Sequence, residues 1–354
     1  MSPLPRKPIA LDLFCGSGAV SLGLKHAGFD VVGAVDFDPS ACCTYKANHS
    51  ETRLIERDIR DVEPELFSDL IADRLDLLVV CAPCQPFSSQ NRHKCNSDSR
   101  NNLVAESKKF ISLFSPTIVF LENVPGLAAS GIFEEFTSWL REECGYDVAT
   151  PMRVDAANLG VPQRRTRMIL IATKGVSLKI ASDIKPVVRS TVSDAIRGLE
   201  SPPLGRTQVG LDPLHFARRH SSLNIQRLQH IPTDGGGRES LPLALQLDCH
   251  KNARKGSFSD TYGRMRWGDV APTLTTGCTD ITRGRFAHPE ENRAITLREA
   301  ARLQSFPDDY IFIGNSAQIA TQIGNAVPPK MMSNIAASLM SAIYSPHNEP
   351  EITS

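Results

Sequence analysis

Short apolar runs alternate with longer amphipathic stretches along the first half of the chain. Runs of strand length, rich in leucine or β-branched residues, occupy residues 9–14, 31–35, 75–80, 117–121 and 168–172. Helical patterns lie between them at residues 19–27, 40–48, 102–114 and 132–143. This alternation predicts an α/β fold with an open, mostly parallel sheet and helices on both faces. Ligands of such sheets bind at the carboxyl ends of the strands, so the residues that follow each strand are the candidates for chemistry.

From about residue 174 the pattern changes, because proline and glycine interrupt every periodic segment. A helical pattern returns at residues 296–304, where Thr296 and Glu299 fit a capping box, and a final helix is expected at residues 330–344. We therefore predict a first domain over residues 1–185, a smaller loop-rich domain over 186–314, a segment over 315–345 that returns to the first domain, and a tail over 346–354.

The formal net charge of the 354-residue chain is zero, but the charges are unevenly distributed. Residues 151–300 carry 23 Lys and Arg against 14 Asp and Glu, and the remainder carries an equal excess of acidic residues. A basic segment within an acidic chain favours contact with a polyanion. An uneven surface without function is the alternative.

Three features point to a cytoplasmic protein without a membrane partner. No stretch reaches the roughly 18 to 20 uninterrupted apolar residues that a membrane helix needs. The first eight residues lack the apolar core of a signal peptide. The nine cysteines form an odd set with irregular spacing, which is typical of a reduced protein rather than a disulfide scaffold.

A glycine-rich turn follows the first predicted strand, at Asp12–Gly18. Glycines in this position let the backbone approach a ligand and open a helix N-terminus toward it. The second strand ends at Asp36, where a carboxylate could hold ribose hydroxyls, and Asp58 follows the next, weaker strand. A tight turn without ligand is the alternative for the glycines alone, but the three elements in order favour an adenosine-bearing cofactor.

Two interpretations compete for Cys84, which follows the fourth predicted strand. Its spacing from Cys81 would suit a redox pair or half of a zinc site. The sequence contains no second pair of this spacing, however, and Pro83 and Pro86 flank a single thiol. We therefore favour Cys84 as a nucleophile and Cys81 as a packing residue. Glu122 ends the next strand and could donate or accept a proton beside it.

Taken in order, these motifs resemble those of the DNA (cytosine-5)-methyltransferase family. The matching segments are Asp12–Gly18, Pro83–Ser88, Glu122–Val124, Gln163–Arg167, Arg293–Asp308 and Gln322–Pro329. Asp36 stands where the family usually has Glu, and Phe37 supplies the aromatic residue after it. The segment after Ser88 lacks the usual glycines but keeps an Asp-x-Arg at 98–100.

The resemblance implies a Rossmann-like catalytic domain and S-adenosylmethionine as methyl donor, with no metal. It also implies sequence-specific methylation at C5 of a cytosine flipped out of duplex DNA, through a covalent bond from Cys84 to C6. Glu122 would act at cytosine N3, and Arg165 and Arg167 would hold O2 and a neighbouring phosphate. A water molecule could remove the C5 proton. The implied cofactor contacts are Phe14, Gly16, Gly18, Asp36, Phe37, Asp58, Ile59, Pro83 and Asn325.

The polar segment 88–101 is a candidate for the loop that closes over the flipped base, and the basic domain for target recognition. The implied DNA contacts are Ser88, Arg92, Arg100 and Gln163. We expect a prokaryotic monomer that acts on chromosomal DNA, with a cognate restriction endonuclease as candidate partner. Nothing in the chain identifies the target sequence.

Three other functions remain open. An RNA (transfer RNA) cytosine-5 methyltransferase would share the fold, but the Cys-Phe-Thr signature of that branch is missing from the sequence. A nicotinamide-dependent oxidoreductase would leave Pro83–Ser88 and Glu122–Val124 without a role. A non-catalytic DNA-binding module would not need Cys84 and Glu122.

Overall fold

The computed structural model describes residues 6–71, 73–83, 103–176, 178, 186–205, 212–251 and 260–344. The chain divides into two compact units. The sheet unit comprises Met1–Asp155, Thr166–Pro186 and Val327–Ser354, and the loop-rich unit comprises Ala156–Arg165 and Val187–Ala326. In the described part of the chain, no helix is long and apolar enough to cross a membrane.

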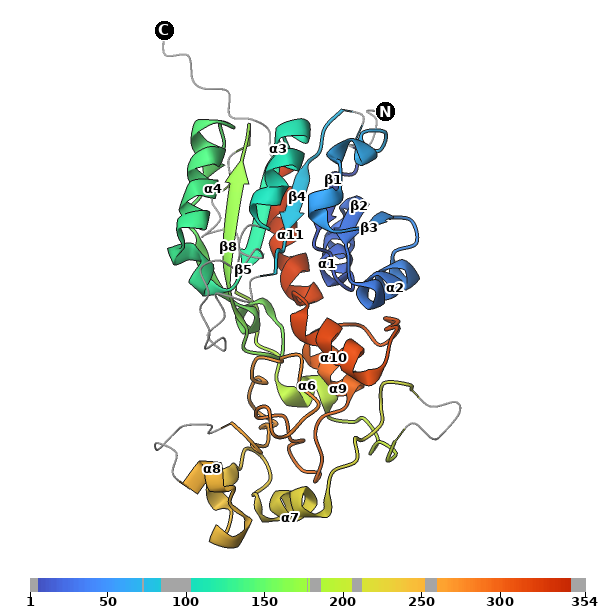
Figure 1. Cartoon of the computed structure of the whole chain (residues 1–354), viewed down its shortest axis with the longest axis vertical. Coiled ribbons are helices and arrows are strands. Elements are labelled where there is room, and N and C mark those ends of the chain that lie inside the picture. Colours follow the sequence, from blue (N-terminus) through green and yellow to red (C-terminus); the bar gives the residue numbers. More distant parts are fainter. Residues whose placement is uncertain are drawn as a thin grey trace. The chain divides into compact units, whose positions relative to one another are not determined.

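One mostly parallel sheet forms the centre of the sheet unit (Figure 1). Its strands are β1 (Ile9–Leu13), β2 (Asp30–Asp36), β3 (Arg53–Glu56), β4 (Leu77–Val80), β5 (Ile118–Asn123), β6 (Asp147–Val148), β7 (Met152–Asp155) and β8 (Thr166–Thr173). They lie in the order β3-β2-β1-β4-β5-β8-β6, and β7 also pairs with β8. The first five strands pair in parallel. The predicted α/β fold class is confirmed.

The direction of β8 corrects one prediction. We expected residues 168–172 to add another parallel strand, but β8 runs antiparallel to β5, β6 and β7. A parallel neighbour needs a long crossover connection, usually a helix. Between β7 and β8 the chain forms only the 3₁₀ turn Ala156–Leu159 as regular structure. The chain therefore returns beside β7 in the opposite direction.

Helices cover both faces of the sheet. In β1 the side chains of Leu11 and Leu13 join a core with α3 (Lys108–Phe114) and α4 (Gly131–Glu142). The alternate residue Asp12 points to the other face, where it contacts Ser21 of α1 (Ala19–Ala27). The last helix, α11 (Pro329–Tyr344), packs on α1 so closely that a Cβ at Gly23 would lie 2.7 Å from the Cβ of Met332. α2 (Pro39–Asn48) connects β2 to β3.

The loop-rich unit contains short helices. They are α6 (Val192–Ile196), α7 (Ser222–His230), α8 (Asp248–Lys251), α9 (Leu297–Leu303) and α10 (Ser316–Asn325). Among its described residues only isolated β-bridges form. Side chains therefore provide some of the hydrogen bonds to the backbone that neighbouring strands provide in a sheet. The Arg264 side chain is 1% exposed and donates to the carbonyls of Leu228, Ile231 and His288 at 2.9 to 3.1 Å.

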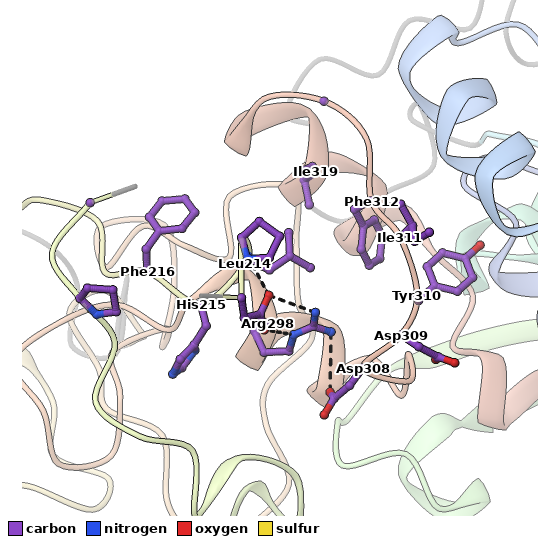
Figure 2. A pocket seen from close by; sticks show the side chains of 15 residues that line it. Leu214, His215, Phe216, Arg298, Asp308, Asp309, Tyr310, Ile311, Phe312 and Ile319 are labelled. Atoms are coloured by element: carbon purple, nitrogen blue, oxygen red, sulfur yellow. Dashed lines mark hydrogen bonds and ion pairs between the residues drawn. The ribbon is translucent and has the colours of Figure 1, made fainter. Parts of the chain in front are cut away.

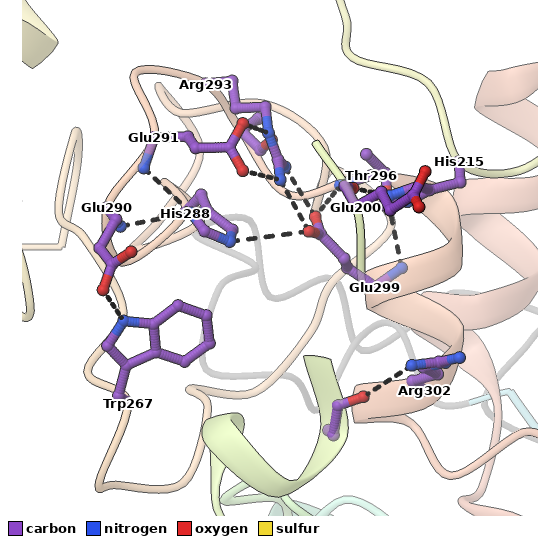
Figure 3. Close-up of polar contacts among 12 residues, drawn as sticks. Glu200, His215, Trp267, His288, Glu290, Glu291, Arg293, Thr296, Glu299 and Arg302 are labelled. Atoms are coloured by element: carbon purple, nitrogen blue, oxygen red, sulfur yellow. Dashed lines mark hydrogen bonds and ion pairs between the residues drawn. The ribbon is translucent and has the colours of Figure 1, made fainter. Parts of the chain in front are cut away.

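A buried ion-pair cluster lies at the start of α9 (Figure 3). Arg293 donates to both carboxylate oxygens of Glu299 at 2.8 Å and also pairs with Glu291 at 2.9 Å. Glu299 and Thr296 form the predicted capping box, which is confirmed. His288 Nε2 lies 3.8 Å from Glu299. Because Glu299 is 1% exposed, the arginine provides most of the compensation for its buried charge.

The same unit contains a cavity of about 620 Å³ (Figure 2). Arg298 lies in its wall between Asp212 and Asp308, and Tyr310 and Phe312 line it from the following loop. None of the predicted site residues that the structure describes lines this cavity.

Candidate functional site

The predicted glycine turn leaves β1 through three residues with positive φ. These are Phe14 at 62°, Gly16 at 52° and Gly18 at 90°. A positive φ is unusual for phenylalanine and is found mainly where surrounding contacts fix the backbone. A Cβ added at Gly16 would meet nothing within 4 Å, so open space faces this turn. The N–H of Gly18 donates to the carbonyl of Cys15 at 2.9 Å and closes the turn before α1 begins.

Asp36 ties the end of β2 to the glycine turn. Its Oδ2 accepts the N–H of Gly16 at 2.8 Å, and its Oδ1 accepts the N–H of Asp38 at 2.9 Å. Burial raises the pKa of this carboxyl above its usual range, against the effect of these backbone donors. Phe37 follows with 62% of its surface exposed, which leaves an aromatic face open to a ligand.

Asp58 lies at the end of β3 and caps the 3₁₀ turn Ile59–Asp61. Its carboxylate accepts the backbone N–H of Arg60 at 3.0 Å and pairs with the Arg60 guanidinium, which lowers the pKa of Asp58 to about 2. Ile59 is buried in the core, and its carbonyl accepts from Lys109 Nζ at 2.8 Å. Parallel pairing places this turn at the same sheet edge as Asp36.

Asp12 was not among the predicted site residues. It lies in β1 just before the glycines, is fully buried, and its Oδ2 accepts from Ser21 Oγ at 2.7 Å. Its other oxygen, Oδ1, has no hydrogen-bond partner among the described residues. Burial raises the pKa of Asp12 to about 7. In the sequence Asp12 is recognisable only as the first residue of its motif. Its burial could not be predicted, because it depends on how α1 packs against β1.

The predicted nucleophile lies just outside the described residues, as do Ser88, Arg92 and Arg100. The chain is described as far as Pro83, which is exposed, and residues 81–83 follow β4 without regular structure. Burial raises the pKa of Cys81 well above its usual range, which suits a packing thiol better than a thiolate. Among the described residues no group of His, Cys, Asp and Glu could hold a metal ion.

Glu122 near the end of β5 and Arg167 near the start of β8 form an ion pair. Arg167 Nε lies 2.9 Å from Glu122 Oε1, and the carboxylate side chain is 8% exposed. The contact lacks the geometry of a hydrogen bond, so Oε1 retains the capacity to accept one. The antiparallel direction of β8 is what brings the two together, because it places the first residues of β8 beside the last residues of β5.

Asn123 was also missed, although it stands within a recognised motif. Its Nδ2 donates to the carbonyl of Ala82 at 3.1 Å, and its Oδ1 accepts the N–H of Val124 at 2.8 Å. It therefore braces the chain just before Cys84. Its place beside Glu122 in the sequence was the signal that could have indicated it.

Gln163 and Arg165 lie in the loop-rich unit and bind other parts of that unit. Gln163 is fully buried, accepts the N–H of Leu274 at 3.0 Å and pairs with the Gln304 amide. Arg165 is 3% exposed and donates to the carbonyls of Leu274 and Gly324 at 3.2 and 3.1 Å. These contacts brace the unit and give no support to the predicted contacts of Gln163 with DNA and of Arg165 with cytosine.

Asn325, a predicted cofactor contact, is exposed at the end of α10. Its carbonyl accepts from Arg165 Nη2 at 3.4 Å. Asn325 and the glycine turn belong to different units.

Comparison with known proteins gives consistent results. The profile of the "C-5 cytosine-specific DNA methylase" family matches residues 10–341. The chain is 37% identical to the Type II methylase M.HgiDII of Herpetosiphon aurantiacus, over 97% of this chain and 98% of the relative. It is 32% identical to the Type II methyltransferase M.XorII of Xanthomonas oryzae pv. oryzae, over 97% and 87% of the respective chains.

Solved structures share the fold at lower identity. An E. coli prophage protein described as a DNA modification methyltransferase superposes with a TM-score of 0.74 at 24% identity, covering 96% of this chain and 100% of the other. Schizosaccharomyces pombe Dnmt2 superposes with a TM-score of 0.66 at 18% identity, covering 95% and 99%.

Proposed function

The chain belongs to the C-5 cytosine-specific DNA methylase family, and we propose that it methylates C5 of one cytosine within a specific duplex DNA sequence, with Cys84 as its nucleophile. The enzyme is thus a DNA (cytosine-5)-methyltransferase. One observation supports the proposed site: the glycine turn, Asp36, the residues directly before Cys84 and the Glu122–Arg167 pair all lie at the same edge of the sheet.

The ends of β1, β2 and β3 fit S-adenosylmethionine. Open space faces Gly16, where a Cβ would meet nothing within 4 Å, and the exposed ring of Phe37 can stack on adenine. The Asp36 carboxylate accepts the N–H groups of Gly16 and Asp38, and its oxygens could also accept from ribose hydroxyls. Asp58 and the turn after it would hold the adenine edge. When bound, S-adenosylmethionine would supply the methyl group from its positively charged sulfonium sulfur, which keeps the electron pair of the broken S–CH3 bond, and S-adenosylhomocysteine would be the product.

Cytosine C5 is too weak a nucleophile to take that methyl group unaided. Addition of the Cys84 thiolate to C6 forms a C–S bond and moves the electron pair of the C5–C6 bond to C5, which can then attack. Glu122 would hold a proton at cytosine N3 while the ring accepts this charge. After methyl transfer, water removes the C5 proton, the C5–C6 double bond reforms and the thiolate leaves.

Arg167 would keep Glu122 in place during this reaction, since its Nε lies 2.9 Å from the carboxylate and its side chain is 15% exposed. A guanidinium in this position can also donate to cytosine O2. Arg165, which binds Leu274 and Gly324, would instead hold the recognition segment in shape. Arg165 and Arg167 would therefore have different roles, although the resemblance implied similar roles for both.

Target recognition is assigned to the loop-rich, basic region 186–314, with duplex DNA as the partner. The names of the relatives as Type II methylases support a cognate restriction endonuclease that reads the same site. We propose that the enzyme acts as a cytoplasmic monomer on chromosomal DNA.

Expression of the full chain in bacteria without cytosine methylation tests the activity and the site together. Bisulfite sequencing of their DNA should show one methylated cytosine within one recurring sequence, and the Cys84→Ser variant should leave the DNA unmodified. Transfer RNA from the same cells serves as the second substrate class. Methylated transfer RNA with unmodified DNA would overturn the proposal in favour of the RNA branch.

A further inference from the structure

A histidine outside every recognised motif contacts the glycine turn. His49 stands at the end of α2, is 1% exposed, and its Nε2 lies 3.0 Å from the carbonyl oxygen of Gly18. The same carbonyl accepts the N–H of Leu22 at 2.9 Å, the first backbone hydrogen bond of α1. The imidazole therefore holds the point where the turn becomes a helix.

The partners of the ring determine which nitrogen carries the proton. Lys25 Nζ lies 3.0 Å from His49 Nδ1, and an ammonium group can only donate, so Nδ1 accepts. A neutral imidazole then has its proton on Nε2, where the Gly18 carbonyl can only accept. Burial, with a smaller contribution from Lys25, lowers the pKa of His49 to about 4. The ring is therefore neutral near pH 7, in the one tautomer that satisfies both contacts.

Further contacts hold Lys25 and the His49 ring in position. Lys25 also pairs with Glu51 and donates to Thr52 Oγ1 at 3.1 Å. The ring of Tyr45 lies 4.7 Å from the imidazole, centroid to centroid, and its hydroxyl is 2.8 Å from Ser21 Oγ. The imidazole thus has little freedom to turn away from Gly18.

Gly18 caps α1 at a φ of 90°, a conformation that glycine adopts without strain, but it has no side chain that could hold the turn in place. Asp36 accepts the N–H of Gly16, and His49 contacts the carbonyl of Gly18, so the turn is held at both glycines. We propose that His49 is a positioning residue for S-adenosylmethionine: it fixes the backbone donors at the N-terminus of α1 in their binding geometry. This inference rests on the proposed function of the glycine turn as the cofactor site.

Two isosteric variants of the full chain separate this role from simple packing. In His49→Gln the amide nitrogen can replace Nε2 as donor to Gly18, whereas in His49→Asn the amide oxygen can replace Nδ1 as acceptor from Lys25. One lost hydrogen bond of ordinary strength should weaken S-adenosylmethionine binding by roughly 3- to 10-fold in His49→Asn. His49→Gln should recover most of the affinity, and kcat at saturating cofactor should fall less than the affinity does in both.

Titration calorimetry gives the cofactor Kd, and thermal unfolding of the same samples gives their stability. If His49 had only a structural role, the cofactor affinity of each variant would follow its thermal stability and would not depend on whether a donor to the Gly18 carbonyl is present. Wild-type affinity in His49→Asn would overturn the inference, as would equal losses in the two variants. A wild-type chain that binds no S-adenosylmethionine would instead overturn the proposed function first.

A measurement on the wild-type chain covers variants that fail to fold. With ¹⁵N-labelled histidine, His49 should show its proton on Nε2, and that resonance should shift when S-adenosylmethionine is added. An Nδ1–H tautomer, or an unchanged resonance at saturating cofactor, would contradict the positioning role.

Discussion

Replacing Asp12 with asparagine should change how the stability of the protein depends on pH. Asp12 is fully buried in β1, and burial raises its pKa from 3.8 to about 7, with Ser21 opposing this and Asp36 adding to it. The folded state therefore holds a proton that the unfolded chain has released between about pH 4 and pH 7. Stability from this group is present below pH 4 and is lost as the pH rises through 7.

The size of the effect follows from the shift. A difference of about three pKa units corresponds to a stability change on the order of 4 kcal/mol across this range. The asparagine side chain would keep the shape and an acceptor for Ser21 but would carry no charge. The free energy of unfolding of Asp12→Asn, relative to wild type, should thus rise by that order between pH 4 and pH 8.

Urea unfolding of both proteins at several pH values between 4 and 8 measures this difference. Ser21→Ala serves as the matched variant with the opposite sign: it removes a donor that favours the charged form, so its stability should decline over a range that extends to higher pH. A constant difference between Asp12→Asn and wild type at all pH values would refute the reasoning.

Three further outcomes test the site and the fold. Asp36→Ala should weaken S-adenosylmethionine binding by about 1.5 to 3 kcal/mol, because it strands the N–H of Gly16 and the ribose hydroxyls, and calorimetry would show this. Duplex DNA with 5-fluorocytosine at the target should become covalently attached to wild type and to Cys81→Ser but not to Cys84→Ser, as denaturing gels would reveal. Arg293→Met should cost about 3 to 5 kcal/mol in chemical unfolding, since it leaves Glu299 buried without its partner, and an added Glu299→Leu should recover much of that loss.

Local signals were enough to predict several elements from the sequence. The helix expected at residues 19–27 has the same bounds in the structure, and the capping box at Thr296 forms as predicted. α10 was missed although Asn315 and Gln318 form a comparable capping box before it. The prolines and glycines around that segment favoured a loop, although the capping-box residues in the sequence indicate a helix start.

Other features depend on contacts between distant segments and have no local signal. A run of β-branched residues predicts a strand at 168–172, but its direction depends on the connection from β7. That direction decides which side chains meet, because Arg167 at the start of β8 lies beside Glu122 at the end of β5 only when the two strands are antiparallel. The sequence motif indicated Arg165 and Arg167 as a pair. In the structure Arg165 instead binds the carbonyls of Leu274 and Gly324.

Burial also explains why the sequence indicated the residues proposed to contact the cofactor better than the residues that support them. A position after a strand is a property of the sequence, and it identified Phe37, which proves 62% exposed. The supporting contacts arise where α2 ends against the turn, which brings His49 to Gly18 across an interval of 31 residues. A histidine at the end of a helix carries no signal of that contact in its own neighbourhood. Its hydrogen bonds to Lys25 and Gly18 become interpretable only once the fold brings a donor and an acceptor to opposite sides of one ring.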